Sequence, residues 1–341
     1  MKTALIAGIR GQDGAYLSKF LLEKGYAVYG ADRRSGETIS WRLKELGIEK
    51  DVTILHMDLL ELTNIIRTIK KLMPDEVYNL ASPSFPQQSF DEPMITSEVG
   101  AMGALRLLDT LRLEHPEAKF YQASTSEMFG KAQTVPQSER TRFYPRSPYG
   151  VAKLFAHWMT VNYRESYKMF ACSGILYNHE SPLRGTEFVT RKITSGVARI
   201  RAGVQDKLVL GNVDAKRDWG YAKEYVEGMW QMLQHDHADD YILATGETHS
   251  VREFVEHAFS AVDITLRWEG TGIDTRGLET KTGKVLVEIS PDFFRPAEET
   301  QLVGDPRKAK ERLGWTSRTT FQDLVTIMVE ADIKRMEKES K

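Results

Sequence analysis

The chain has 341 residues, 41% hydrophobic and 28% charged, which is enough for two structural units or one large α/β unit with an appendage. Its 46 Lys and Arg against 48 Asp and Glu give a formal net charge of -2, which argues against nucleic-acid binding. Charges interrupt every apolar run before it reaches membrane-spanning length. The single cysteine, Cys172, cannot form an intramolecular disulfide. We therefore expect a cytoplasmic protein without a membrane or nucleic-acid partner.

Strand-like and helical segments alternate along the first third of the chain. Short β-rich runs predict a buried strand at residues 3–7 and further strands at 27–30, 52–55, 76–80 and 119–122. Helical spacing of apolar residues predicts helices at 15–22, 41–46 and 64–72. This alternation favours parallel strands joined by right-handed crossovers. Later in the chain, a polar loop is predicted at 270–284, followed by a strand at 285–287.

A glycine-rich turn joins the first predicted strand to the first predicted helix. It reads Gly8-Ile9-Arg10-Gly11-Gln12-Asp13-Gly14, with the spacing G-x-x-G-x-x-G. Glycine at a strand end lets the backbone approach a pyrophosphate, and the helix N-terminus offers free N–H groups to that anion. The motif alone also marks plain turns, but its position between strand and helix favours a dinucleotide site.

Charged residues follow the second and third predicted strands. Asp32 lies where a carboxylate would bind the ribose hydroxyls of NAD, whereas Arg33 and Arg34 would suit the 2′-phosphate of NADP. We favour NADP, with NAD as the alternative. Asp58 and Leu59, after the third strand, are candidates for contact with the adenine.

Tyr149 and Lys153 lie four residues apart in a predicted helix that Ser147 can cap and Pro148 can begin. A cation near the phenol would lower the pKa of Tyr149 toward the working range. Together with the glycine-rich turn, this pair resembles the extended short-chain dehydrogenases/reductases. That resemblance implies that the Tyr is the base for a sugar hydroxyl and that the Lys holds the nicotinamide ribose.

A second polar cluster, Ser124-Thr125-Ser126-Glu127, ends the fifth predicted strand. The carboxyl ends of parallel strands face the ligand crevice in such sheets, although helix capping is the simpler explanation for Ser and Thr. Glu127 is the more informative residue. A carboxylate beside the Tyr and Lys permits removal of a proton from the carbon next to a transient ketone, which is elimination chemistry.

Over nearly its whole length the sequence resembles the GDP-mannose 4,6-dehydratase family. The resemblance rests on eight blocks in order, at residues 11–14, 120–127, 144–149, 178–182, 188–192, 214–219, 244–253 and 295–298. It implies that Tyr149 removes the 4-hydroxyl proton while hydride moves from C4 to NADP. Thr125 would form a hydrogen bond to the same 4-oxygen. Glu127 would then abstract the C5 proton and help water to leave C6, after which hydride returns to C6.

The resemblance also implies binding roles for residues outside the catalytic group. The implied NADP ligands, beyond the glycine-rich turn, Asp58 and Leu59, are Arg33, Arg34, Ser35, Leu80, Ser84, Tyr149, Lys153, His179 and Arg184. The implied GDP-sugar ligands are Ser84, Asn178, Arg191, Arg217, Arg295 and Glu298. No metal site is expected. Relatives form dimers or tetramers, and helices after Pro93 and Ser147 are candidates for the contact.

One loop departs from the family pattern. Pro83 replaces the usual Gln, and Pro86 stiffens the same segment. Because this loop borders the sugar, a related GDP-sugar such as GDP-manno-heptose is an alternative substrate. A non-catalytic dinucleotide-sensing protein is a remoter alternative, which the intact catalytic residues disfavour.

The expected fold is therefore α/β, a Rossmann-type doubly wound parallel sheet with a smaller C-terminal α/β domain. Residues 1–177, with returning segments at about 211–247, would form the NADP-binding domain. Residues 178–210 and 248–335 would form the domain that binds the GDP-sugar.

Overall fold

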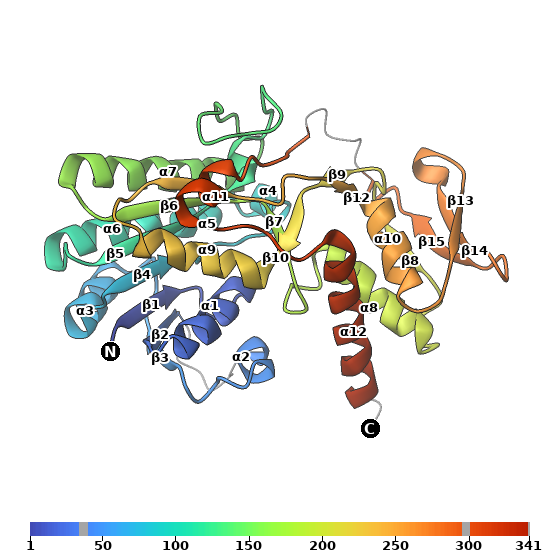
Figure 1. Cartoon of the computed structure of the whole chain (residues 1–341), viewed down its shortest axis with the longest axis horizontal. Helices are drawn as coiled ribbons and strands as arrows, with labels where there is room; N and C mark the ends of the chain where they lie inside the picture. Colours follow the sequence, from blue (N-terminus) through green and yellow to red (C-terminus); the bar gives the residue numbers. More distant parts are fainter. Residues whose placement is uncertain (34–39, 295–300, 340–341) are drawn as a thin grey trace.

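The computed structural model describes residues 1–33, 40–294 and 301–339, which form a larger unit and a smaller unit (Figure 1). The larger unit is built on one seven-stranded sheet in the order β11-β6-β5-β4-β1-β2-β3. Its strands are β1 (Thr3–Ala7), β2 (Ala27–Asp32), β3 (Thr53–His56), β4 (Glu76–Asn79), β5 (Lys119–Thr125), β6 (Ala171–Leu176) and β11 (Asp240–Leu243). Every pairing in this sheet is parallel.

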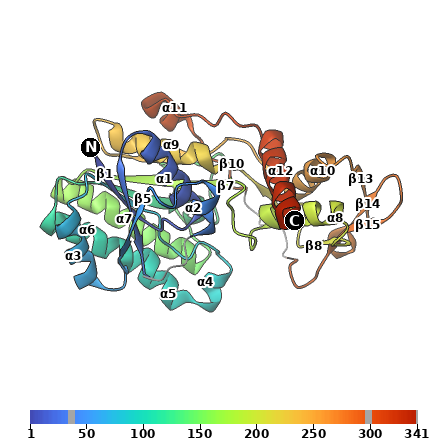
Figure 2. The same cartoon turned by 90° about the horizontal axis from the view of Figure 1, so that it is seen from below.

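Helices cover both faces of the large sheet, as the Rossmann prediction requires (Figure 2). α1 (Gln12–Glu23) and α9 (Ala222–Gln234) pack on one face, and α3 (Leu62–Leu72), α6 (Gly103–Glu114) and α7 (Pro148–Tyr167) on the other. Alternate side chains of β1 serve the two layers: Ala4 and Ile6 join the first core, Leu5 and Ala7 the second. Burial on both faces explains why β1 is a continuous apolar run from Ala4 to Ala7.

The larger unit also contains shorter helices and helical turns. They are α2 (Trp41–Glu45), α4 (Gln88–Asp91), α5 (Pro93–Ser97), the π-helical turn η1 (Glu98–Met102), the 3₁₀ turn η2 (Ser126–Met128) and α11 (Arg307–Leu313). The strand order reverses between β1 and β4, so a crevice is expected at the carboxyl ends of these two strands.

The smaller unit combines a four-stranded sheet with three helices. Its sheet has the order β13-β14-β15-β8, from β8 (Leu208–Leu210), β13 (Leu266–Glu269), β14 (Arg276–Glu279) and β15 (Val285–Ile289). The helices are α8 (Val189–Arg201), α10 (Val251–Ser260) and α12 (Phe321–Glu339). Two short pairs, β7 (Asn178–Glu180) with β10 (Trp219–Tyr221) and β9 (Lys216–Arg217) with β12 (His249–Ser250), lie between the units.

Two segments differ from the sequence expectations. The predicted loop at 270–284 contains the 3₁₀ turn η3 (Gly272–Asp274) and strand β14, because β13 and β15 supply hydrogen-bond partners on both sides. α11, within the range expected for the second domain, packs instead against α9 and β11. Trp315, just after α11, belongs to the core of the larger unit. Among the described residues, no helix is both long and apolar enough to cross a bilayer.

Candidate active site

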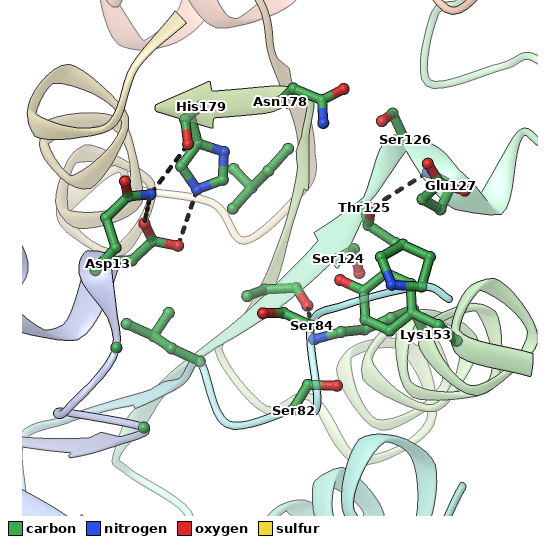
Figure 3. A pocket seen from close by; sticks show the side chains of 18 of the residues that line it. Asp13, Ser82, Ser84, Ser124, Thr125, Ser126, Glu127, Lys153, Asn178 and His179 are labelled. Carbon is green, nitrogen blue, oxygen red and sulfur yellow. Dashed lines mark hydrogen bonds and ion pairs between the residues drawn. The ribbon is translucent and has the colours of Figure 1, made fainter. Parts of the chain in front are cut away.

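A cavity of about 270 Å³ opens at the carboxyl ends of β1, β4, β5 and β6, at the junction of the two units (Figure 3). Fourteen predicted site residues line it: Gly8, Gly11, Gln12, Asp13, Gly14, Leu80, Ser84, Thr125, Glu127, Tyr149, Lys153, Asn178, His179 and Arg184. They come from segments far apart in the sequence, which the parallel sheet brings together at one edge.

The glycine-rich turn has the backbone geometry that a dinucleotide site needs. Gly8 has a positive φ of 88°, and a Cβ there would lie 2.9 Å from the backbone nitrogen of Ala81. A Cβ on Gly14 would lie 2.4 Å from the carbonyl oxygen of Gly8, so α1 can start close to β1 only with glycine at this position. These close approaches form a cradle, followed by the free N–H groups of α1, that fits a pyrophosphate.

A buried ion pair joins this turn to the second wall of the cavity. His179 Nε2 lies 2.9 Å from Asp13 Oδ2, and its Nδ1 lies 2.7 Å from the carbonyl oxygen of Tyr177. Burial by itself would lower the pKa of His179, but the adjacent Asp13 carboxylate outweighs burial and raises it. The same pairing lowers the pKa of Asp13 against the opposing effect of burial. The charged pair therefore ties β7 to the start of α1 (Figure 3).

Ser147 and Pro148 begin α7 as the sequence predicts. The Ser147 hydroxyl accepts a hydrogen bond from the backbone N–H of Gly150 at 3.1 Å, and Pro148 is the first helical residue. The cap aims the first turn of α7 at the cavity, so that Tyr149 and Lys153 both line it.

The expected lowering of the Tyr149 pKa is wrong for this structure. Burial raises the pKa of the phenol, and the charge of Glu127 adds to that, although the Thr125 hydroxyl beside it acts in the opposite direction. Lys153 does not offset this, because its Nζ lies 5.8 Å from the ring centre and burial lowers the pKa of its own ammonium group to about 8. Lys153 Nζ donates instead to the carbonyl oxygen of Ala123 at 2.9 Å.

Glu127 lies in η2, directly after the end of β5. Its backbone N–H donates to Thr125 Oγ1 at 3.2 Å, so Thr125 both caps the turn and lines the cavity (Figure 3). Glu127 and Tyr149 line the same cavity, and the Glu127 charge acts to raise the pKa of Tyr149. A hydroxyl, a phenol and a carboxylate thus share one wall.

The loop after β4 is fixed to the start of α7. Ser89 Oγ donates to the carbonyl oxygen of Pro86 at 2.5 Å and accepts from the backbone N–H of Tyr149 at 3.2 Å. Ser84 and Pro86 line the cavity, so the loop that departs from the family pattern borders the cavity. Pro83 contributes its carbonyl oxygen as an acceptor for Ser82, at 3.4 Å.

Several predicted ligands lie outside the cavity lining. Ile9 is fully buried against Gly30, and Arg10 forms an ion pair with Asp32. The Asp58 carboxylate accepts from the backbone of Leu60. The remaining predicted ligands away from the lining are Arg33, Leu59, Arg191 and Arg217. The predictions for Arg34, Ser35, Arg295 and Glu298 fall outside the described residues.

Arg191 has a structural environment that the sequence did not indicate. It is 6% exposed, its Nε donates to both carboxylate oxygens of Asp332 at 2.9 Å, and its Nη1 donates to the carbonyls of Pro182 and Arg184. These contacts join α8 to α12. A substrate role for Arg191 stays a prediction.

Some lining residues had no role in the sequence expectations. Ser82, Leu176, Tyr177 and Phe188 line the cavity. Phe188 makes an edge contact with Phe85, at 5.6 Å between ring centres, and its ring lies 3.5 Å from the Arg184 guanidinium. Position at a strand end could have indicated Leu176 and Ser82, whereas the Phe188 contact depends on how the two units pack. No group of three or more His, Cys, Asp or Glu within the described ranges is arranged to hold a metal ion.

Solved structures with this fold include two whose titles give a bound nicotinamide dinucleotide. The dTDP-glucose 4,6-dehydratase of Bacillus anthracis, in complex with NAD, matches with a TM-score of 0.79 at 19% identity and covers 100% of both chains. RMD from Pseudomonas aeruginosa, complexed with NADPH, matches with a TM-score of 0.75 at 19% identity, over 98% of this chain and 100% of that one. At these identities the likeness establishes the fold. Fold and site together define a Rossmann-type α/β protein with a glycine-rich turn at the carboxyl end of β1.

Sequence comparison identifies the family within this class. A family model described as GDP-mannose 4,6 dehydratase matches residues 5–328. GDP-mannose 4,6-dehydratase of Vibrio cholerae is 50% identical over 350 residues, with 98% of this chain and 94% of the relative covered. The Homo sapiens enzyme of that name is 50% identical over 341 residues, covering 98% and 92%. The chain belongs to the GDP-mannose 4,6-dehydratase family.

Proposed function

We propose that the chain converts GDP-mannose to GDP-4-keto-6-deoxy-mannose and that it keeps NADP bound through each turnover. The observation that carries this is the convergence of Thr125, Glu127, Tyr149 and Lys153 on one cavity beside the glycine-rich cradle. When bound, the nicotinamide supplies a hydride acceptor for C4, a hydride donor for C6 and, while oxidised, a positive charge that favours the phenolate. The cradle at Gly8 and Gly14 supports a fit for the pyrophosphate.

The chain's own residues move the protons. Tyr149 Oη takes the proton from the sugar 4-hydroxyl while Thr125 Oγ1 donates to the same oxygen. Once C4 is a ketone, the C5 proton is acidic, and Glu127 removes it. Glu127 returns that proton to the departing 6-hydroxyl, which leaves as water. The proton held by Tyr149 is then available for C5, so the phenolate is restored and protons balance over the cycle.

The test is an incubation of the purified protein with GDP-mannose and no added reductant. The expected product is lighter by one water and, in heavy water, carries solvent deuterium at C5. Unchanged substrate, with cofactor bound to the protein, would refute the proposal. An equimolar competition with GDP-manno-heptose decides whether the Pro83 and Pro86 loop has shifted the preferred sugar.

NADP, rather than NAD, is part of the proposal. Asp32, the residue that could bind ribose hydroxyls, is already paired with Arg10, and Arg33 follows it. Changing Arg33 and Arg34 to Ala should weaken NADP binding about 10- to 100-fold, since charge-assisted bonds to the 2′-phosphate are lost. Titration with both dinucleotides measures this. NAD affinity should hardly change, and Arg201→Ala on α8 serves as the control for the loss of surface charge. An equal loss for both dinucleotides would contradict the assignment.

We also propose a cytoplasmic homodimer formed through α5 and α7. Exposed apolar side chains lie at helical spacing on α7, at Val151, Phe155 and Trp158, beside Met94 on α5, which is 78% exposed. The same face of a second copy would cover this stripe about a twofold axis. The variant Phe155→Glu plus Trp158→Glu should then sediment as a monomer, while a wild-type monomer in analytical ultracentrifugation would refute the dimer.

A further inference from the structure

Three polar side chains are buried together behind the wall of the cavity. Ser124 Oγ lies 2.7 Å from Ser173 Oγ, which lies 2.8 Å from His157 Nδ1. A third, longer contact of 3.5 Å joins Ser124 Oγ to the same ring nitrogen. Ser173 is fully buried, and the other two are each 3% exposed. Of the three, Ser124 lines the cavity, so the cluster leads from the site into the core.

The cluster joins the strand and the helix that carry the catalytic groups. His157 follows Lys153 by one helical turn and Tyr149 by two, so the three side chains share one face of α7. Ser124 directly precedes Thr125 at the end of β5, and Ser173 lies on the neighbouring strand β6. These hydrogen bonds therefore help to align β5 with α7, in addition to the hydrogen bond from Lys153 to the carbonyl of Ala123.

Packing alone does not require polar groups at this position. Buried hydroxyl and imidazole groups lose their hydration, and an apolar contact would serve equally well between a helix and a sheet. The surroundings of His157 are in fact aromatic, with the Phe143 ring centre at 5.2 Å and that of Trp158 at 5.4 Å. What the hydrogen bonds add over an apolar contact is direction, since they fix the rotamer of each hydroxyl.

We propose that His157 is a positioning residue of the reaction: through Ser173 it fixes the Ser124 hydroxyl and, with it, the strand end that carries Thr125 and Glu127. Burial lowers the pKa of His157. The Asp240 carboxylate acts to raise this pKa, and the Arg164 guanidinium acts to lower it further. A neutral imidazole has one nitrogen that can accept a hydrogen bond, so Nδ1 can accept from the Ser173 hydroxyl and Ser173 can accept from the Ser124 hydroxyl. This series of hydrogen bonds leaves the lone pairs of Ser124 for the cavity side. The inference rests on the proposed function.

The test compares variants that break or preserve the chain. His157→Phe, which keeps an aromatic ring, and Ser173→Ala, which removes one oxygen, should each lower kcat about 10-fold with little change in KM, because only the reacting geometry is disturbed. His157→Asn keeps a polar atom near the position of Nδ1 and should restore kcat to within about threefold of the wild type. Rates are measured with whichever GDP-sugar the wild-type chain dehydrates, so failure of the substrate assignment is distinguished from failure of this inference.

Thr160→Val is the matched control. Thr160 is fully buried on the same helix, but its hydroxyl donates to the carbonyl of Ala156, at 2.8 Å, so this hydrogen bond stays within α7. It should reduce the melting temperature without reducing kcat. If Ser173→Ala keeps wild-type kcat, or if Thr160→Val reduces kcat as much as the cluster variants do, His157 is structural only. Failure of His157→Phe to fold leaves the decision to Ser173→Ala and His157→Asn.

Discussion

Changing Glu127 to Gln is expected to reduce dehydration of the GDP-sugar about 10³-fold or more, while substrate binding changes little. Gln keeps the size of the side chain but cannot accept the C5 proton. Oxidation at C4 depends on Tyr149 and Thr125, so it should persist and leave the bound nicotinamide reduced. Absorbance of the reduced nicotinamide measures C4 oxidation, and mass spectrometry of the product measures the loss of water.

The matched control for this variant is Glu139→Gln. Glu139 is also a partly buried carboxylate, but it accepts from the backbone N–H of Ile242 at 2.9 Å and does not line the cavity. Its replacement should leave turnover unchanged. Normal water loss in the Glu127 variant would remove the base from the mechanism and with it the elimination step.

Changing Lys153 to Met should abolish activity and at the same time stabilise the fold at neutral pH. The Lys153 side chain is 3% exposed, and its pKa is lowered from 10.5 to about 8. A shift of this size corresponds to about 3 kcal/mol of lost stability. Losing the bond to the Ala123 carbonyl costs about 1 kcal/mol in return, so the net gain is about 2 kcal/mol. Urea denaturation measures it.

The sign of the pH dependence follows from the lowered pKa. Between about pH 8 and the unfolded value of 10.5, the unfolded chain binds the Lys153 proton more tightly than the folded chain does. The penalty is therefore complete below pH 8 and disappears as the pH rises to 10.5. The stability gain of Lys153→Met should shrink over the same window. A gain that is independent of pH would show that packing, not buried charge, is responsible.

Lys119→Met provides the comparison for that experiment. Lys119 also donates its Nζ to a backbone carbonyl, that of Leu233 at 2.6 Å, but it is only partly buried. Because the side chain is only partly buried, its removal should bring no gain at neutral pH. This pair of variants separates the cost of charge burial at the site from the general effect of replacing Lys by Met.

Part of this protein follows directly from local sequence signals. The glycine-rich turn at 8–14 and the spacing of Tyr149 and Lys153 each lie within one strand–turn–helix or one helix, so sequence distance determines their geometry. The strands of the first third are predicted for the same reason, since short β-rich runs between turn residues have few alternative structures. Fourteen of the predicted site residues accordingly line one cavity.

Contacts between distant segments were decided only by the tertiary structure. The strand β14 depends on partners at 266–269 and 285–289, and the pairing of Arg191 with Asp332 joins residues 141 positions apart. The state of Tyr149 also depends on burial, which raises its pKa where the nearby Lys alone predicts the opposite. Sequence spacing determines which side chains share a face, but desolvation and long-range pairing depend on what covers that face, and this is set by the packing of the whole chain.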